Sequence, residues 1–404
     1  MQRIAVIGLG ASGLAFCSML NYPKIAIEKN DFAGRKLLAT GNGRCNFTNK
    51  NLSYKNYTSK DSNFCKKALS KFSLKEILSY FKKIGIDYVM LESGRYYPKT
   101  MSAKTVQSVL LEEAKKKSKF LFNKEVKDID FLNKEIICKD EKISYDYLVL
   151  SFGGKTLKKS GSDGKIFEIL KKNKIKIEKF LPGIINFDTK IKPTKLMKGT
   201  KVKAKLTLTV DGKLVKYSTE DVLFQDYGIS GTAVFNISNE AVINLENNKK
   251  CVCYIDFCYD YEYEKLVSEL KRRKKLFKNR NINDFLLGLV HEKLISEIIY
   301  RSLRKKVKIE DLSDKEIEKI AKTLKFFEYE LISPHSFDSA QVTIGGVSCD
   351  EIDPETMRLK RFDGVYIIGE AIDVSGDCGG YNLQRAFTSA FSAYSNLKEI
   401  LCLK

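Results

Sequence analysis

The chain has 404 residues, of which 43% are hydrophobic and 30% charged, and its net charge is +21. This composition predicts a folded protein of about two or three domains and excludes a largely disordered chain. No apolar run reaches the roughly 18 residues of a membrane span, and the apolar start carries nucleotide-binding glycines rather than a signal-peptide pattern. We therefore expect a cytoplasmic protein with no membrane contact. Ten cysteines without a C-x-x-C and only two histidines predict reduced thiols and no metal site.

The first segment has the pattern of a strand, a glycine turn, a helix and a second strand. Ile4–Gly8 is apolar, residues 8–13 read GLGASG, a helix extends to about Leu20, and Lys24–Glu28 is the second strand. Glycines in such a unit let a pyrophosphate approach the helix N-terminus, and a carboxylate at Glu28 accepts hydrogen bonds from a ribose. This predicts a dinucleotide other than NADP, bound by Gly8, Gly10, Ala11, Ser12, Gly13, Glu28 and Lys29.

Residues 34–49, GRKLLATGNGRCNFTN, combine glycines, basic residues and short polar side chains. Glycines allow the backbone to approach a bulky ligand, and the basic residues favour an anionic one. The loop therefore suits a flavin dinucleotide. The residues expected to contact it here are Arg35, Lys36, Thr40, Gly41, Asn42, Gly43, Arg44, Cys45 and Asn46.

The middle of the chain changes character twice. Helical periodicity covers 64–84 and 102–117, and strand-like segments around 120–150 end in Tyr147–Leu150. Gly153 and Gly154, which follow shortly after, are two further expected contacts. Residues 184–260 alternate apolar and polar positions, as in 203–210, which predicts a small antiparallel β domain. Residues 261–334 are predicted to be mainly helical and are strongly basic.

Residues 340–404 return to glycine-rich α/β sequence. A strand is predicted over 364–369, and the pair at 379–380 precedes a helix whose N-terminus could stabilise negative charge on a reduced flavin. An NAD dehydrogenase typically places its substrate domain after the cofactor domain, whereas this chain returns at its end, which favours FAD. The contacts expected at this end are Gly369, Glu370, Asp373, Gly379, Gly380, Tyr381, Asn382 and Leu383.

The chain resembles the YhiN/BaiN-type flavoproteins, also described as aminoacetone-oxidase-like NAD(P)/FAD-dependent oxidoreductases. The resemblance rests on GLGASG, the 34–49 loop, ESGRYYP (92–98), LSFGG (150–154), DYGISGTAVFNIS (226–238), AQVTIGGV (340–347) and GEAIDVSGDCGGYNLQRAF (369–387). It implies an α/β fold whose split Rossmann-like FAD-binding domain comprises residues 1–183 and 335–404. It also implies an inserted β-barrel-like domain at 184–260 and a helical, basic subdomain at 261–334. The chain departs from the family pattern at Ser151, Phe152 and Thr232.

Hydride transfer belongs to the flavin, so the protein must orient it and supply a proton. NADH or NADPH is expected as a transient reductant. Cys45 is one candidate proton donor, because the neighbouring Arg44 is expected to lower its pKa. Cys378 and Tyr381 are the others, and the two cysteines could alternatively form a redox disulfide.

The resemblance implies several substrates: conjugated C=C bonds of steroid-like molecules, amines, and uridine in large-subunit ribosomal RNA, which becomes dihydrouridine. The charge of +21 favours RNA, although the excess is mostly lysine, which an AT-rich genome also produces. The candidate phosphate contacts are Lys271–Lys275, Lys278, Arg280, Arg301, Arg304, Lys305 and Lys306. A small-molecule reductase or oxidase, or an RNA-binding factor with structural FAD, remains the alternative. The protein is expected to be a monomer or a weak oligomer.

Overall fold

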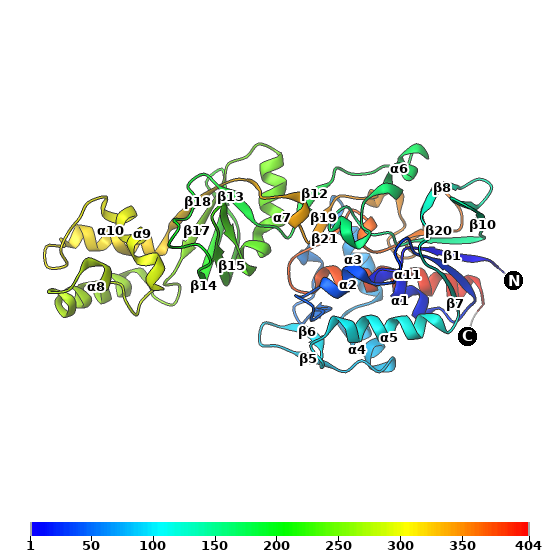
Figure 1. Ribbon diagram of the computed structural model, residues 1–404, viewed down its shortest axis with the longest axis horizontal. Coiled ribbons are helices and arrows are strands. Elements are labelled where there is room, and N and C mark those ends of the chain that lie inside the picture. The colour runs from blue at the N-terminus through cyan, green and yellow to red at the C-terminus, as the bar shows by residue number, and fades with distance from the viewer. Residues whose placement is uncertain (1, 403–404) are drawn as a thin grey trace. The chain divides into compact units, whose positions relative to one another are not determined.

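The computed structural model describes residues 2–402 and divides the chain into two compact units (Figure 1). The first unit combines Met1–Gly183 with Ala340–Lys404, and the second is Ile184–Ser339. The predicted fold class is confirmed: the first unit holds a Rossmann-type parallel sheet, and the second holds a closed barrel with helices. The division differs from the three expected parts, because the barrel and the helical segment form one unit.

A five-stranded parallel sheet forms the centre of the first unit. Its order is β20 (Val365–Ile367), β11 (Tyr147–Leu150), β1 (Ile4–Ile7), β2 (Lys24–Ile27) and β7 (Ser118–Leu121). All residues of β1 and β20 are buried. Both strands are purely apolar apart from one tyrosine, as expected for parallel strands that are covered on both faces. Because β20 pairs with β11, the sheet needs both ends of the chain.

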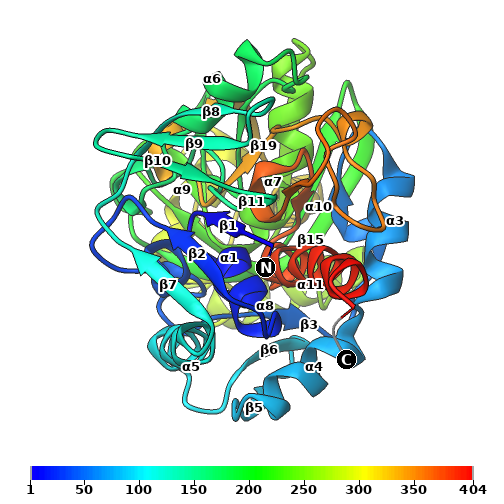
Figure 2. The same cartoon turned by 90° about the vertical axis from the view of Figure 1, so that its right-hand side faces the viewer.

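Different layers cover the two faces of this sheet (Figure 2). One face carries the helices α1 (Ala11–Met19), α5 (Ala103–Lys115) and α11 (Tyr381–Ile400). The other carries a three-stranded antiparallel sheet of β8 (Val126–Asp130), β9 (Glu135–Cys138) and β10 (Lys142–Ser144). The predicted helices after the glycine turn, over 102–117 and after 379–380 are confirmed.

The single helix predicted over 64–84 is wrong, because two helices occupy this range. Ser73 ends the first and caps the second: its backbone N–H and hydroxyl both donate to the Glu76 carboxylate. Such a capping box starts a new helix even where the apolar period continues. The two helices are α3 (Ser62–Lys71) and α4 (Leu74–Lys83).

The other elements of the first unit are short. They are α2 (Arg35–Ala39), β3 (Thr48–Asn49), β4 (Tyr57–Thr58), β5 (Tyr88–Met90), β6 (Arg95–Pro98), α6 (Lys165–Lys172), β12 (Leu181–Gly183), β19 (Val342–Ile344) and β21 (Ser375–Gly376). No helix within residues 2–402 combines the length and the apolar character that crossing a membrane requires.

The second unit is a closed barrel with four α-helices in the connections between its strands. The barrel order is β13 (Phe187–Thr189), β16 (Gly228–Ser230), β15 (Lys213–Phe224), β14 (Lys201–Val210), β17 (Cys251–Asp256) and β18 (Phe327–Pro334). The helices are α7 (Thr232–Glu246), α8 (Tyr263–Phe277), α9 (Glu292–Leu303) and α10 (Asp314–Lys325), of which α7 precedes β17. Strand β18 closes the barrel from within the segment 261–334 that was expected to be mainly helical.

Candidate functional site

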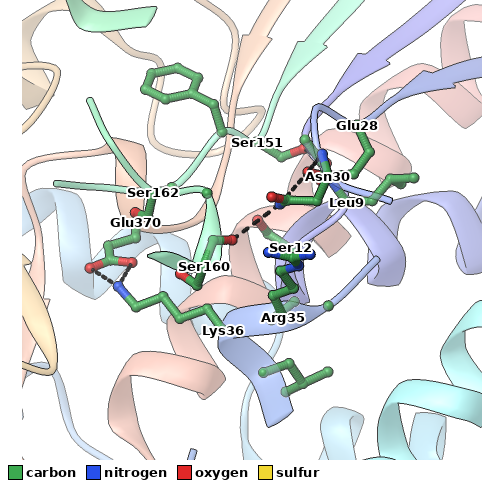
Figure 3. A pocket seen from close by; sticks show the side chains of 18 of the residues that line it. Leu9, Ser12, Glu28, Asn30, Arg35, Lys36, Ser151, Ser160, Ser162 and Glu370 are labelled. Atoms are coloured by element: carbon green, nitrogen blue, oxygen red, sulfur yellow. Dashed lines mark hydrogen bonds and ion pairs between the residues drawn. The ribbon is translucent and has the colours of Figure 1, made fainter. Parts of the chain in front are cut away.

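A cleft of about 1280 Å³, including its open mouth, lies in the first unit (Figure 3). It is formed by the ends of β1, β2 and β11, by α2, by the first turns of α1 and α11, and by the loop 160–166. The expected contacts that line it are Gly8, Gly10, Ala11, Ser12, Glu28, Lys29, Arg35, Lys36, Thr40, Gly153, Glu370, Asn382 and Leu383.

The glycine turn after β1 has two kinds of glycine. A Cβ at Gly13 would lie 2.1 Å from the Gly8 carbonyl oxygen, so Gly13 serves close packing inside the turn. At Gly10 a Cβ would meet no protein atom within 4 Å, although the residue lines the cleft. Gly10 therefore leaves room for a ligand to approach the N-terminus of α1. The Ser151 hydroxyl supports the turn by donating to the Gly8 carbonyl at 2.6 Å.

The Glu28 carboxylate is 7% exposed and accepts hydrogen bonds on both oxygens. The Leu9 N–H donates to Oε2 at 2.8 Å, and the backbone and side-chain N–H groups of Asn30 donate to Oε1 at 3.0 and 2.7 Å. Glu28 thus links the end of β2 to the glycine turn. An adenosine ribose would share this carboxylate with Asn30 (Figure 3).

Lys36 and Glu370 form an ion pair inside the cleft, 2.6 Å between Nζ and Oε2 (Figure 3). The Lys36 ammonium also donates to the Thr156 hydroxyl, and the Thr343 N–H donates to Glu370. Burial alone would raise the pKa of Glu370, but the Lys36 charge and these hydrogen bonds hold it below its ordinary value. Glu370 is therefore ionised and can accept hydrogen bonds from the hydroxyl groups of a bound sugar or ribityl chain.

The loop 34–49 meets the start of α11 although the two are more than 300 residues apart in sequence. Asn49 donates from Nδ2 to the Gly379 carbonyl at 3.0 Å, and the Thr48 hydroxyl donates to Gln384 at 2.7 Å. Strand β21 pairs with β4 beside this contact. The expected contacts that do not line the cleft lie mostly in this loop and near this junction: Gly13, Gly41, Asn42, Gly43, Arg44, Cys45, Asn46, Gly154, Gly369, Asp373, Gly379, Gly380 and Tyr381.

The expected effect of Arg44 on Cys45 is wrong. Cys45 is fully buried, and burial raises the pKa of its thiol to about 12. The Arg44 guanidinium instead lies over the Tyr97 ring at 5.3 Å. Burial also raises the pKa of Tyr381 to about 12, whereas Cys378 is only half-buried. Within the described residues, Cys45 and Cys378 are not joined in a disulfide.

The sequence analysis missed the loop at 160–164, which reads SGSDG and lines the cleft. Lys29 binds its Asp163 at 2.9 Å, and Asn30 donates to the Ser160 carbonyl at 3.2 Å. Its small and polar residues were a signal of the same kind as the loop 34–49. Arg385 on α11 was also missed, since nothing in its sequence neighbourhood distinguishes it from a surface arginine.

The cleft fits a dinucleotide such as FAD. Two of its side-chain atoms, Arg35 Nε and Ser162 Oγ, are buried without a hydrogen-bond partner. Buried polar groups normally have partners, so both atoms are suited to phosphate or hydroxyl groups of a ligand. Together with the open space at Gly10, they provide donors beside the α1 N-terminus, where a pyrophosphate binds.

Comparison with known proteins places these features in a family. Residues 2–396 match the family model described as the HI0933-like protein Rossmann domain. The 3-dehydro-bile acid delta(4,6)-reductase of Clostridium scindens is 29% identical, covering 97% of this chain and 98% of its own. Ribosomal RNA dihydrouridine synthases are 26% identical, with 97% of both chains covered for Escherichia coli and 96% for Haemophilus influenzae.

Substitution by alanine should have different effects at Gly10 and at Gly13. Gly10→Ala should leave the apoprotein folded, because its Cβ meets no protein atom, but weaken FAD binding about tenfold or more. Gly13→Ala should destabilise the fold by about 1–3 kcal/mol, because its Cβ overlaps the Gly8 carbonyl. Fluorescence titration with FAD and denaturant unfolding measure both effects. Unchanged FAD affinity in Gly10→Ala would contradict this site.

The raised pKa of Asp373 predicts that the free energy of unfolding depends on pH. Burial and the neighbouring Glu178 charge raise its pKa to about 6, opposed by Lys60, the Gly345 N–H and Arg385. Its contribution to stability is therefore fully present below the unfolded pKa and is lost as pH rises through about 6. Asp373→Asn should make the apoprotein more stable at about pH 7, by at most about 3 kcal/mol, and change it little at about pH 4. Urea unfolding at both pH values measures this, and an equal effect at both would contradict the assignment.

Proposed function

This chain belongs to the HI0933-like flavoprotein family, and on that premise we propose that it reduces uridine to dihydrouridine in large-subunit ribosomal RNA. At the level of the family it is an FAD-dependent oxidoreductase. The proposal adds the substrate, the bond that is reduced, and NADH or NADPH as the transient reductant.

The names of the two kinds of relative support one shared chemistry. Dihydrouridine is uridine with two hydrogens added across C5=C6, a double bond conjugated to the C4 carbonyl. A delta(4,6)-reductase of a 3-dehydro bile acid acts on double bonds conjugated to a 3-oxo group. Either reduction balances if a hydride adds to the conjugated system at a carbon remote from the carbonyl and a proton adds to a carbon nearer the carbonyl. This shared bond type is the observation that carries the proposal, since both relatives span nearly all of this chain.

Bound FAD supplies the hydride chemistry, and the residues of the chain hold the cofactor and deliver the proton. Gly10, Arg35 and Ser162 would hold the pyrophosphate region, and Glu28 the ribose. Of the three candidate proton donors, Cys378 is favoured. It is half-buried beside the glycines that begin α11, whereas Cys45 lies in the hydrophobic core and Tyr381 is almost fully buried.

The internal contacts of the basic helical segment make it a weaker candidate for the RNA contact than its sequence suggested. Six basic residues of the helical segment have internal partners: Lys271, Arg272, Arg273, Lys274, Arg301 and Lys305 bind carboxylates or backbone carbonyls. Residues 184–339 contain 29 Lys and Arg against 23 Asp and Glu, a net charge of +6. The remaining +15 lies in the unit that contains the cleft, so most of the excess charge belongs to that unit and not to the helical segment.

Exposed cations follow the 34–49 loop directly. Lys50 and Lys55 are exposed and form no ion pair with any residue that the structure describes, while Asn49, next to Lys50, is buried and bonded to Gly379. Tyr54 between them is 39% exposed. Exposed lysines around an exposed aromatic ring are suited to phosphates and an unstacked base. A uridine would have to leave its stack to reach the flavin.

A small-molecule substrate is the second candidate, because the relative with 29% identity is named for a bile acid. Such a substrate requires an apolar pocket and no basic surface. Its turnover, followed as reoxidation of bound FAD, should be insensitive to moderate salt. An RNA substrate requires affinity that falls steeply with salt.

Deletion of the gene should remove dihydrouridine from a position in large-subunit ribosomal RNA. Mapping that RNA in the deletion strain and in its parent tests this directly, because the modification changes a single base. An unchanged map would refute the RNA substrate.

Complementation of the same strain tests the proton donor. Wild-type protein and Cys45→Ala should restore the modification, and Cys378→Ala should not. Restoration by Cys378→Ala would remove its proposed role. If the bound FAD of purified protein resists both NADH and NADPH, a structural role for FAD is favoured instead.

The exposed lysines should control RNA affinity. The double variant Lys50→Gln with Lys55→Gln should bind an unmodified transcript of large-subunit RNA more weakly. The slope of log affinity against log salt should become shallower by about 1.4, the value for two lost phosphate contacts. Filter binding across a salt series measures it.

The matched control is Lys271→Gln with Arg272→Gln, which removes the same charge from residues already paired with Asp314 and Glu269. This control should leave the slope unchanged. The opposite pattern would place the RNA on the helical segment and contradict the contact proposed at Lys50 and Lys55.

A further inference from the structure

Arg385 is a buried cation of the first unit, and two of its guanidinium nitrogens have no hydrogen-bond partner within the described residues. It lies in the second turn of α11 and is 7% exposed. The two nitrogens are Nε and Nη1, both buried, and among residues 2–402 no carboxylate forms an ion pair with the guanidinium within 4.0 Å. A buried charge that is neither paired nor hydrogen-bonded is strongly unfavourable. Such a residue indicates that another charged group completes the site.

The protein itself offers only indirect compensation. Glu370 and Asp373 are the carboxylates whose charges act on Arg385. Glu370 is already engaged by Lys36 and by the Thr343 N–H. Asp373 holds a proton more tightly than an ordinary aspartate. Both carboxylates are charged at neutral pH, but within residues 2–402 neither forms an ion pair with the Arg385 guanidinium, so their compensation is indirect.

Arg385 stands between two cavities. It lines the FAD cleft together with its helix neighbours Asn382, Leu383 and Ala386. On its other side is a smaller cavity of about 330 Å³, which has no acidic residue in its lining: Tyr57, Phe64, Cys65, Ala68, Leu69, Met357, Ile372, Val374, Thr388 and Ser389. This mainly apolar lining neither neutralises Arg385 nor suits an anion, whereas the FAD cleft also contains Lys29, Arg35 and Lys36, so an anionic ligand would reach Arg385 from the cleft.

We propose that Arg385 stabilises the negative charge that a flavin ring gains on reduction, and so raises the reduction potential of the bound FAD. A hydride carries two electrons and one proton, so a ring that accepts it gains one negative charge unless a second proton follows. The N-terminus of α11 has a partial positive charge and faces the same cleft through Asn382 and Leu383. Arg385 adds a full charge one turn further along that helix.

In this role Arg385 lowers the stability of the apoprotein, whereas in the holoprotein it favours the reduced state of FAD. Removing an uncompensated buried charge often leaves stability unchanged or increases it. A structural arginine behaves in the opposite way, because its loss leaves its partners unpaired. The two roles are therefore distinguished by the sign of the stability change together with the potential. The inference concerns FAD alone and does not depend on the RNA substrate.

The test is the midpoint potential of bound FAD, measured by dye-equilibrated reduction of wild type, Arg385→Met and Arg385→Lys. In Arg385→Met the ratio of reduced to oxidised FAD at a fixed potential should fall about tenfold, which is about 30 mV for a two-electron couple. Arg385→Lys keeps the charge and should stay near the wild-type potential. Apo Arg385→Met should unfold at the same or a higher urea concentration than wild type.

The matched control is Arg3→Met, which removes an exposed arginine paired with Asp146 and should leave the potential unchanged. An unchanged potential in Arg385→Met, or an equal shift in Arg385→Lys, would overturn the proposal. A wild-type potential that shifts with chloride, while that of Arg385→Met does not, would assign the charge to a small anion instead. Should Arg385→Met fail to fold, Arg385→Gln removes the charge while keeping polar donors and provides the same comparison.

Discussion

The structure depends on contact between two segments from opposite ends of the chain. Strand β20 joins the parallel sheet only by pairing with β11, and the residues after it form the start of α11. That helix start is held by Asn49 and Thr48, which follow the loop near the N-terminus. Because these are buried hydrogen bonds between polar groups, their loss leaves donors unpaired in the interior. The cleft therefore forms only when both ends are folded together.

The distribution of charge follows from this arrangement. Most of the lysines and arginines on α8 and α9 bind carboxylates or backbone carbonyls within the second unit. The first unit has the larger excess of positive charge, and individual cations lie in its interior. Lys36 is paired and positions Glu370, whereas Arg385 has no direct partner. Net charge alone cannot separate these uses, since a paired lysine and a free one are the same letter in a sequence.

The sequence predicted best those features in which the backbone conformation allows only one type of residue. The fold needs residues without a Cβ at Gly8, Gly13 and Gly380, where an added Cβ would lie within 3.0 Å of other protein atoms, so these positions can be read directly from the sequence. Strand β18 was missed because its strand pattern follows a long helical segment, and only barrel closure reveals it. The effect of burial on Cys45 was missed because a neighbouring arginine in sequence need not face the same way. Arg385 was missed because the absence of a partner is a property of three-dimensional packing.

The central claim is that this chain is a flavin reductase whose reduced cofactor passes its hydride to uridine in RNA. The most direct measurement is the visible absorption of the purified holoprotein under anaerobic conditions. The account predicts that NADH or NADPH bleaches the flavin band and that an unmodified transcript of large-subunit RNA restores it. The same transcript already carrying dihydrouridine should leave the band bleached. Equal reoxidation by both transcripts, or by neither, would contradict the claim.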